Sequence, residues 1–426
     1  MFPGLTRACH ACALAVVLVV VADARAAEGP EPTGELTLAT AVATARARNP
    51  DLAAGMYELS AADARITQSK LRPNPELAVD LENFAGSGAA RGADALEATL
   101  SLSQVVELGG KREFRVSAAQ AELDLATVER QAHELDLLAE VTRRFIDVVA
   151  AQERLRVAGD AATLAQNSSS AIGVRVDAGR SPEAERSRAK IALTRARIEQ
   201  RQAESDVQAA RVALSAQWGS VEPRFTQARA DLFALPPILS LAALAERVES
   251  APDLVRFASD ARLKEAELRL ARAQARPNLT FSLGVRRFQE TNDTGLVAGF
   301  SMPLSIADRN QGAISAAQAR LRQSAALRQA ALLRMRSSLF GLHQEVSATQ
   351  ARVETLRTEA LPQAQLALEQ TRNGYERGRF SFLELATAQQ ELLAIEAAAV
   401  DAAADYHRLL AELERLTSAA LVQTNR

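Results

Sequence analysis

The side chains that could bind a metal ion are few and widely spaced in this sequence. Its 426 residues include only four histidines and two cysteines. His133, His343 and His407 each lack a second histidine three or four positions away, the spacing that places two ligands on one helical face. The cysteines, Cys9 and Cys12, both lie close to the N-terminus. The sequence therefore predicts no metal site.

Motifs for phosphate binding or acid–base catalysis are also missing from the sequence. The segment Gly109-Gly110-Lys111-Arg112 has suitable residue types, but it lacks the Gly-x-x-x-x-Gly-Lys spacing of a phosphate-binding loop. It indicates a turn from a strand into a helix. The many carboxylates alternate with arginines at helical spacing, which favours solvated ion pairs over a catalytic pair. We predict no catalytic residue, no cofactor and no enzymatic activity.

The composition is typical of long helices. Lys and Arg number 50 against 52 Asp and Glu, so the net charge is −2, and no basic stripe with interleaved aromatic residues occurs. The sequence therefore predicts that the protein does not bind nucleic acid. Aromatic residues make up only 4% of the chain, whereas alanine, leucine, glutamate, glutamine and arginine are abundant.

The N-terminus has the pattern of a secretory signal. Arg7 precedes an apolar run at 11–21, and small residues follow at 24–27. We predict that residues 1–27 are a cleaved signal peptide, so both cysteines are lost and no lipid anchor is present. An uncleaved membrane anchor is the alternative. No apolar stretch of spanning length follows residue 27, so any entry into a membrane must use β-strands.

The rest of the chain contains two copies of one pattern, about 200 residues apart. Five short motifs recur in the same order, at offsets of 198 to 204 residues: Thr37-Leu38-Ala39 and Ser240-Leu241-Ala242, Asn49-Pro50-Asp51 and Ala251-Pro252-Asp253, Arg72-Pro73-Asn74 and Arg276-Pro277-Asn278, 117–121 and 315–319, and 178–181 and 377–380. Such a repeat predicts two structural units. We assign residues 28–220 and 240–426 to the units and 221–239 to a linker.

Each unit contains two segments in which apolar and polar residues alternate. These predicted strands span 76–84 and 96–104 in the first unit, and 279–288 and 295–304 in the second. Their length and two-faced character suit tilted transmembrane strands, although a half-buried sheet in a soluble domain has the same alternation. Four strands cannot close a barrel, so we expect several chains to pool their strands.

Long helices follow each pair of strands. No proline occurs between Arg112 and Pro182 or between Pro303 and Pro362, and the apolar residues there recur every seven positions. The series are Val141, Val148 and Leu155; Met335, Leu342, Thr349 and Leu356; and Leu339, Val346, Val353 and Ala360. A helix of about 60 residues is about 90 Å long. Glycine-containing turns at 176–182 and 375–381 predict that both helices reverse far from the strands.

These features together resemble the TolC-type outer-membrane efflux proteins, over nearly all of residues 36–420. The resemblance rests on the duplication, the strand pair after Arg72-Pro73-Asn74, and Tyr375-x-x-Gly378 followed by Phe382-Leu383-Glu384-Leu385. Two further segments are similar to the cobalt–zinc–cadmium branch of that family: 71–76 with Leu81-Glu82-Asn83-Phe84, and 104–112 with Glu107-Leu108-Gly109-Gly110-Lys111-Arg112.

The resemblance implies a mostly α-helical chain with a small transmembrane β part and a duplicated TolC-like fold. Three chains would form a homotrimer with an α-helical barrel in the periplasm and a twelve-strand β-barrel, four strands per chain, in outer-membrane lipid. It also implies two protein partners, a periplasmic adaptor (membrane fusion) protein and a proton-driven inner-membrane pump of the RND class. The expected function is passive export of solute, in particular divalent heavy-metal cations.

The resemblance also points to the turns at the helical tips as the adaptor contact and gate. Gly179, Arg180 and Ser181 occupy the first turn, and Tyr375, Gly378 and Arg379 the second. Glu384 matches a position at which relatives carry an acidic residue lining the constriction. Thr387 stands where a second acid is often found, so the resemblance does not extend to a doubled acidic ring. A solvated carboxylate that favours the start of its helix is the other interpretation of Glu384.

Two other functions fit parts of the pattern. A TolC-like channel for drugs or for type I protein secretion would have the same architecture. A periplasmic coiled-coil adaptor or scaffold would have the heptads, but it should also contain a β-rich, lipoyl-like stretch between its helices, which the sequence lacks.

Overall fold

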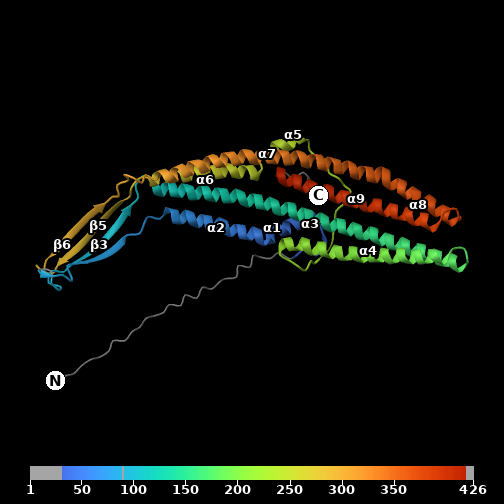
Figure 1. Cartoon of the computed structure of the whole chain (residues 1–426), viewed down its shortest axis with the longest axis horizontal. Coiled ribbons are helices and arrows are strands. Elements are labelled where there is room, and N and C mark those ends of the chain that lie inside the picture. The colour runs from blue at the N-terminus through green and yellow to red at the C-terminus, as the bar shows by residue number, and fades with distance from the viewer. Residues whose placement is uncertain (1–30, 89–90, 419–426) are drawn as a thin grey trace, which may run out of the picture.

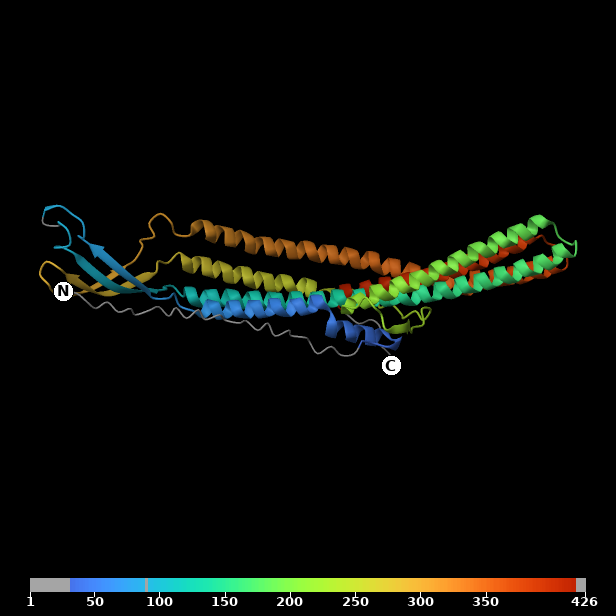
Figure 2. The ribbon, with the colours of Figure 1, turned by 90° about the horizontal axis from the view of Figure 1, so that it is seen from below.

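A computed structural model describes residues 31–88 and 91–418 (Figure 1). The predicted signal peptide at 1–27, with Cys9 and Cys12, lies outside the described residues. The described chain is a long rod: a small sheet forms one end, helices run along the rod, and two helical turns form the other end (Figures 1 and 2). Among the described residues, no helix combines the length and apolar character required to cross a bilayer.

The elements of the first half follow the predicted order. They are β1 (Gly34–Leu36), α1 (Leu38–Arg48), α2 (Pro50–Lys70), β2 (Glu76–Glu82), β3 (Glu97–Val106), α3 (Lys111–Asp177), α4 (Glu183–Ser215), a 3-10 turn (Ala216–Trp218) and β4 (Phe225–Ala228). The predicted strands at 76–84 and 96–104 correspond to β2 and β3, with ends shifted by one or two residues.

The second half repeats the order from α1 to α4, without counterparts of β1 and β4 among the described residues. Its elements are α5 (Leu241–Val248), α6 (Pro252–Gln274), β5 (Leu279–Phe288), β6 (Thr294–Ser301), α7 (Gln311–Thr355), a π-helical turn (Leu356–Ala360), α8 (Leu361–Glu376) and α9 (Phe382–Thr417). β5 has the predicted bounds. β6 ends before the predicted residue 304, because Pro303 cannot donate a hydrogen bond to a neighbouring strand.

The longest helix, α3, extends from the sheet to the far turn. Its 67 residues give a length of about 100 Å. Gly110 precedes it in the left-handed conformation, and Gly179 ends it in the same conformation. Glycine adopts this conformation at little cost, so the two glycines set the ends of the helix.

The corresponding helix of the second half extends past Pro362 to the predicted turn at 375–381. α7 continues through the π-helical turn into α8, and Pro362 lies in the first turn of α8. A proline inside a helix removes one backbone hydrogen bond and crowds the preceding turn. The wider π-helical turn immediately before Pro362 accommodates that disruption, so the rod continues to Glu376.

The predicted heptad positions face the interior of the rod to different degrees. Leu339, Val346 and Val353 are buried, whereas Met335 and Leu342 are only partly buried. The first series therefore forms the seam between α7 and its neighbours, and the second borders it.

The predicted linker at 221–239 contains a strand that the sequence did not reveal. β4 pairs in parallel with β1, so that Gly34 lies opposite Phe225 and Leu36 opposite Ala228. Leu36 and Phe225 are fully buried. The linker is therefore part of the middle of the rod, where it fastens the N-terminal strand to the end of the first half. Strands of three and four residues are too short to show period-two alternation, which explains the omission.

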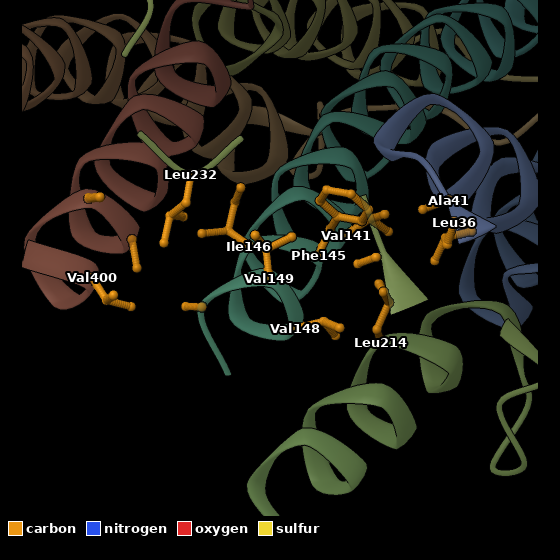
Figure 3. Close-up of a cluster of buried hydrophobic side chains, with 14 of the residues drawn as sticks. Leu36, Ala41, Val141, Phe145, Ile146, Val148, Val149, Leu214, Leu232 and Val400 are labelled. Carbon is orange, nitrogen blue, oxygen red and sulfur yellow. The ribbon is translucent and has the colours of Figure 1, made fainter. Parts of the chain in front are cut away.

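The main hydrophobic core lies at this middle section. Figure 3 shows side chains of α3 there, with Val141 and Phe145 near Leu36 of β1, and Val148 near Leu214 of α4. Ile146 and Val149 of the same helix lie on the side of Leu232 and Val400 (Figure 3). One stretch of α3 thus packs against elements from both halves of the chain, which holds the halves together.

Asn49 connects the helix pair α1–α2 to this middle section, and we expect its replacement by alanine to be destabilising. Its side-chain oxygen accepts from the Leu52 amide at 2.9 Å, and its Nδ2 donates to the Gln217 carbonyl oxygen at 2.9 Å. Loss of such a cap costs about 1–2 kcal/mol. The measurement is denaturant unfolding of the purified protein. The control is Ser240→Ala, whose exposed cap bond of 3.4 Å should matter less; equal effects of the two changes would contradict the expectation.

Candidate functional site

The four-stranded sheet joins the two halves and has two unlike faces. Its order is β2-β3-β5-β6, all antiparallel, with β3 and β5 pairing across the repeat. β2 and β6 are its edges. The register places residues of one kind in rows across the sheet, so each face can be read from the pairing. The rows of the first face are Leu77, Leu102, Leu283 and Ala298, and Val79, Leu100, Val285 and Leu296.

The apolar face is widely exposed in the single chain. Leu77 is 67% exposed, Leu296 is 83% exposed and Phe300 is 78% exposed. A contiguous exposed surface of large aliphatic and aromatic side chains requires an apolar environment, either lipid or another protein. On strands of this length, an exposed apolar face is typical of a surface that contacts lipid.

The opposite face is polar, and one arginine organises part of it. The Arg286 guanidinium donates to Glu97 Oε2 at 2.7 Å and to Thr99 Oγ1 at 2.9 Å, and it lies 2.9 Å from Glu82 Oε2. These contacts link β2, β3 and β5. Asp80 lies in the same row as Thr99. This face therefore offers hydrogen-bonding and charged groups, with more carboxylates than cations.

At the other end of the rod, the two predicted turns share one backbone geometry. In the first turn, the Gly179 amide donates to the Val176 carbonyl oxygen at 2.9 Å, and the Arg180 amide to that of Arg175 at 2.8 Å. In the second, the matching bonds run from Gly378 to Tyr375 at 3.0 Å and from Arg379 to Gly374 at 2.8 Å. Both glycines have positive φ. This is the paired-bond helix ending for which glycine is preferred.

A direct contact joins the two turns. The Arg175 guanidinium lies 4.7 Å from the centre of the Tyr375 ring, and its Nη1 donates to the Tyr375 carbonyl oxygen at 3.2 Å. Tyr375 is buried against Ile172 and Phe382. Burial raises the pKa of the Tyr375 hydroxyl, so it remains neutral. The Arg175–Tyr375 contact thus fastens the end of α3 to the end of α8.

The remaining predicted tip residues are exposed, except for Ser181, which is half-buried. Arg180 and Arg379 form no ion pair in the part of the chain that the structure describes. Ser181 follows the first glycine and precedes α4, whereas Ser381 and Glu384 form a reciprocal cap at the start of α9.

In that cap, the Ser381 amide donates to Glu384 Oε2 at 2.7 Å, and the Glu384 amide donates to Ser381 Oγ at 3.4 Å. The bond from the Ser381 backbone holds the pKa of the Glu384 carboxyl below its usual value. Thr387, one turn later, donates its hydroxyl to the Leu383 carbonyl oxygen at 2.9 Å. Glu384 therefore caps the start of α9 together with Ser381.

Two tip residues were missed from the sequence. Arg175 contacts Tyr375 across 200 positions, and no local pattern marks such a pair. Gly374 lies where any side chain would overlap the ring of Phe380. Here a signal existed: a glycine within the last turn of a helix costs about 1 kcal/mol, which suggests a close contact at that position.

The histidines do not form a site in the described residues, where no group of three or more His, Cys, Asp or Glu could hold a metal ion. They lie on different helices, α3, α7 and α9. His133 is exposed, with Nδ1 4.0 Å from Asp136. His407 Nε2 lies 2.9 Å from the Leu232 carbonyl oxygen, and burial lowers the pKa of its ring. His407 therefore helps to fix the linker on α9.

The sequence matches a family model described as Outer membrane efflux protein, over residues 41–220 and again over 243–419. The cobalt-zinc-cadmium resistance protein CzcC of Cupriavidus metallidurans is 32% identical over 364 residues, which cover 85% of each chain. The double match confirms the duplication that the five recurring motifs predicted.

Solved structures share the fold. A membrane protein from Pseudomonas aeruginosa aligns with a TM-score of 0.74 at 19% identity, covering 91% of this chain and 92% of the other. CusC, described in connection with folding and transmembrane channel formation, aligns with a TM-score of 0.74 at 17% identity, covering 89% and 91%. These likenesses confirm the predicted duplicated, mostly helical TolC-like fold.

Proposed function

This chain belongs to the outer membrane efflux protein family, and we propose that it forms the outer-membrane exit duct of a tripartite system that exports divalent metal cations. Members of this family are channel components rather than enzymes, and the chain is an outer-membrane efflux protein. The metal assignment draws on the name of the relative CzcC, a cobalt-zinc-cadmium resistance protein, and on the charge of the polar sheet face.

The two-faced sheet at the end of a long helical rod carries this proposal. A single chain leaves the edges of β2 and β6 unpaired and exposes the apolar face, which is unfavourable in water. Three copies that pair β6 of one with β2 of the next close a twelve-strand barrel. The apolar faces then meet lipid, and the rods form a tube of about 100 Å on the periplasmic side.

The charges of the polar face suit cations. Glu76, Asp80, Glu82 and Glu97 lie on this face of β2 and β3. Among the described strand residues, Arg286 is the one cation on this face, since Arg287 follows it on the other face. In a trimer, this excess of carboxylates over cations occurs three times around the channel. The channel therefore favours cations over anions. Export needs no energy from this chain, because the inner-membrane pump of the RND class drives the transport.

We assign the tip to contact with the periplasmic adaptor protein and to gating. The residues are Gly179, Arg180, Ser181, Tyr375, Gly378, Arg379 and Glu384. Two observations support the assignment: Arg180 and Arg379 are exposed, and a groove of about 360 Å³ runs between α3, α8 and α9 next to Tyr375. The Arg175–Tyr375 contact favours the closed tip, because it holds the two turns together.

The processing and domain organisation complete the proposal. Residues 1–27 are a signal peptide that is removed on export, and the mature chain carries no lipid anchor. The mature chain consists of two repeats, 28–220 and 240–426, connected through 221–239. The termini of the mature protein are measurable by N-terminal sequencing and intact mass.

Deletion of the gene tests the function. We expect the deletion strain to become more sensitive to zinc, cobalt and cadmium, while its sensitivity to a panel of drugs stays unchanged. Re-introducing the gene should restore metal tolerance, and the protein should fractionate with the outer membrane as a heat-resistant trimer in detergent.

Other outcomes identify the rival functions. Sensitivity to drugs without sensitivity to metals would assign the channel to a drug pump, and loss of a secreted protein would assign it to type I secretion. A water-soluble monomer that fractionates away from the outer membrane would identify a periplasmic scaffold and contradict the proposal.

Glu384 provides a prediction that separates gating from capping. Glu384→Gln removes the charge, and we expect it to lower the preference of the channel for cations, measured as a reversal potential across a planar bilayer with a salt gradient. Ser381→Ala removes the cap and keeps the charge, so it should leave that preference unchanged. If Glu384→Gln has no effect, the residue only caps α9.

The pH dependence has a definite sign. Because the pKa of the Glu384 carboxyl is lowered in the folded chain, its charge and its contribution to the cap are complete at neutral pH. Both are lost as the pH falls through that lowered pKa, below the usual range for glutamate. The preference for cations should therefore persist at pH 6 and decline only in more acidic solution.

A further inference from the structure

A basic groove lies where the sheet meets the helices of the first repeat. It has a volume of about 910 Å³ and is formed by the end of α2, the segment before β2, the end of β3 and the start of α3. We call it the junction groove. The residues used in the argument are Lys70, Arg72, Gln104, Val106, Lys111 and Arg112.

The side chains that give the junction groove its positive charge are Lys70, Arg72, Lys111 and Arg112. In the part of the chain that the structure describes, Lys70, Arg72 and Arg112 form no ion pair or hydrogen bond with another side chain. Lys111 Nζ donates to a neutral oxygen, Asn278 Oδ1, at 2.6 Å. Four positive charges therefore line the groove with no carboxylate bonded to any of them.

Two carboxylates also line the groove, but one of them is already neutralised. Glu107 accepts from Arg115 Nη1 at 2.7 Å and from Arg115 Nη2 at 3.1 Å, and the bond from Arg115 holds the pKa of Glu107 below its usual value. Only Glu113 remains against the four cations. The junction groove is thus complementary to an anion.

The backbone adds to this character. α3 starts at Lys111, and its preceding residue, Gly110, has no side chain to bond the first amides of the helix. Open amides at the start of a helix bind phosphate and carboxylate groups well. Residues 110–113, at this helix start, line the groove together with Lys70 and Arg72.

The junction groove is continuous with the apolar face of the sheet. Gln104 and Val106 have the alternation of Leu100 and Leu102, and therefore belong to that face at its end nearest the helices. Val106 and Leu71 are exposed beside it. A molecule that lies along the apolar face and ends in an anionic group would fit both surfaces.

We propose that the junction groove binds the phosphate of an anionic phospholipid, whose acyl chains lie along the apolar face of the sheet. This rests on the proposed function, in which that face meets the bilayer. The groove then lies at the depth of the headgroups on the periplasmic side, where arginine and lysine are favoured next to anionic lipids. One lipid per chain would fix the height of the barrel in the membrane.

Native mass spectrometry of the full-length trimer in detergent tests this proposal. The probes are dioleoyl phosphatidylglycerol, dioleoyl phosphatidylcholine and inorganic phosphate. We expect phosphatidylglycerol to bind roughly tenfold or more tightly than phosphatidylcholine, and the Arg72→Gln/Arg112→Gln variant to lose that preference. A matched variant with two exposed cations of α4 replaced, Lys190→Gln/Arg195→Gln, should keep it.

Three results would overturn the proposal: equal binding of the two lipids, an undiminished preference in the Arg72→Gln/Arg112→Gln variant, or binding of inorganic phosphate alone. Conductance in bilayers of pure phosphatidylcholine is recorded in parallel. If the parent protein forms no trimer in detergent and conducts no current even when phosphatidylglycerol is added to the bilayer, the proposed function fails. If it forms a conducting trimer but shows no lipid preference, only the lipid site fails.

Discussion

Replacing Gly284 by alanine prevents assembly of the barrel. Gly284 lies in the middle of β5, and a Cβ built on it would lie 2.7 Å from the Leu100 carbonyl oxygen and 3.1 Å from Ser101 Cα. Both are backbone atoms of β3, so the strand itself must move. β3 and β5 form the pair that joins the two repeats, and every copy in a trimer would carry the same displacement.

We expect this variant to show no heat-resistant trimer in detergent and to restore no metal tolerance to the deletion strain. The matched control is Gly299→Ala in β6, where the added Cβ meets only Ser282 Oγ, the end of a small side chain that can rotate. That control should assemble and function. A normal trimer from Gly284→Ala would show that the two repeats are not held in register by this strand pair.

Replacing Arg175 by alanine produces a leaky channel. The change removes a stacking contact and a charged hydrogen bond to the Tyr375 carbonyl oxygen, together worth roughly 2 kcal/mol. A difference of that size increases the ratio of open to closed tips about thirtyfold. We expect higher resting conductance in planar bilayers, and sensitivity to a large antibiotic that the outer membrane normally excludes.

Two further variants make this result specific. Arg175→Lys keeps the charge but loses the planar group that stacks on the ring, so an intermediate leak is expected. Arg188→Ala removes an exposed arginine of α4, one of the helices at the same tip, and should leave the conductance unchanged. If Arg175→Ala conducts like the parent while its trimer is intact, the contact is structural and the gate lies elsewhere.

The strands and the tip turns could be predicted because their signals are local. Alternation at Leu77, Val79 and Leu81 follows from the pleat of a strand, and Gly179 and Gly378 mark helix ends because few other residues adopt the required backbone conformation. Each feature needs only a few neighbouring residues. The order of elements was therefore available from the sequence.

Features that depend on distant residues could not be predicted in this way. The Arg175–Tyr375 contact requires the two tips to lie side by side, which no sequence period encodes. The helix through Pro362 depends on the preceding π-helical turn, which Arg357 fastens to the linker through a hydrogen bond to the Phe233 carbonyl oxygen. The start of α9 is local by contrast: a carboxylate at the helix start was one of the two interpretations of Glu384, and the structure adds its reciprocal cap with Ser381.

The parallel pairing of β1 with β4 has a consequence for the order in which the chain folds. Gly34 has no strand partner until Phe225 is available. The entropic cost of closing the long loop between them is moderate, because it grows only with the logarithm of the loop length. Once residue 228 has crossed the inner membrane, the N-terminal half has both strands of this pair. It can complete that connection while the C-terminal half is still being delivered, which shortens the time that an incomplete chain is exposed to proteases and to aggregation.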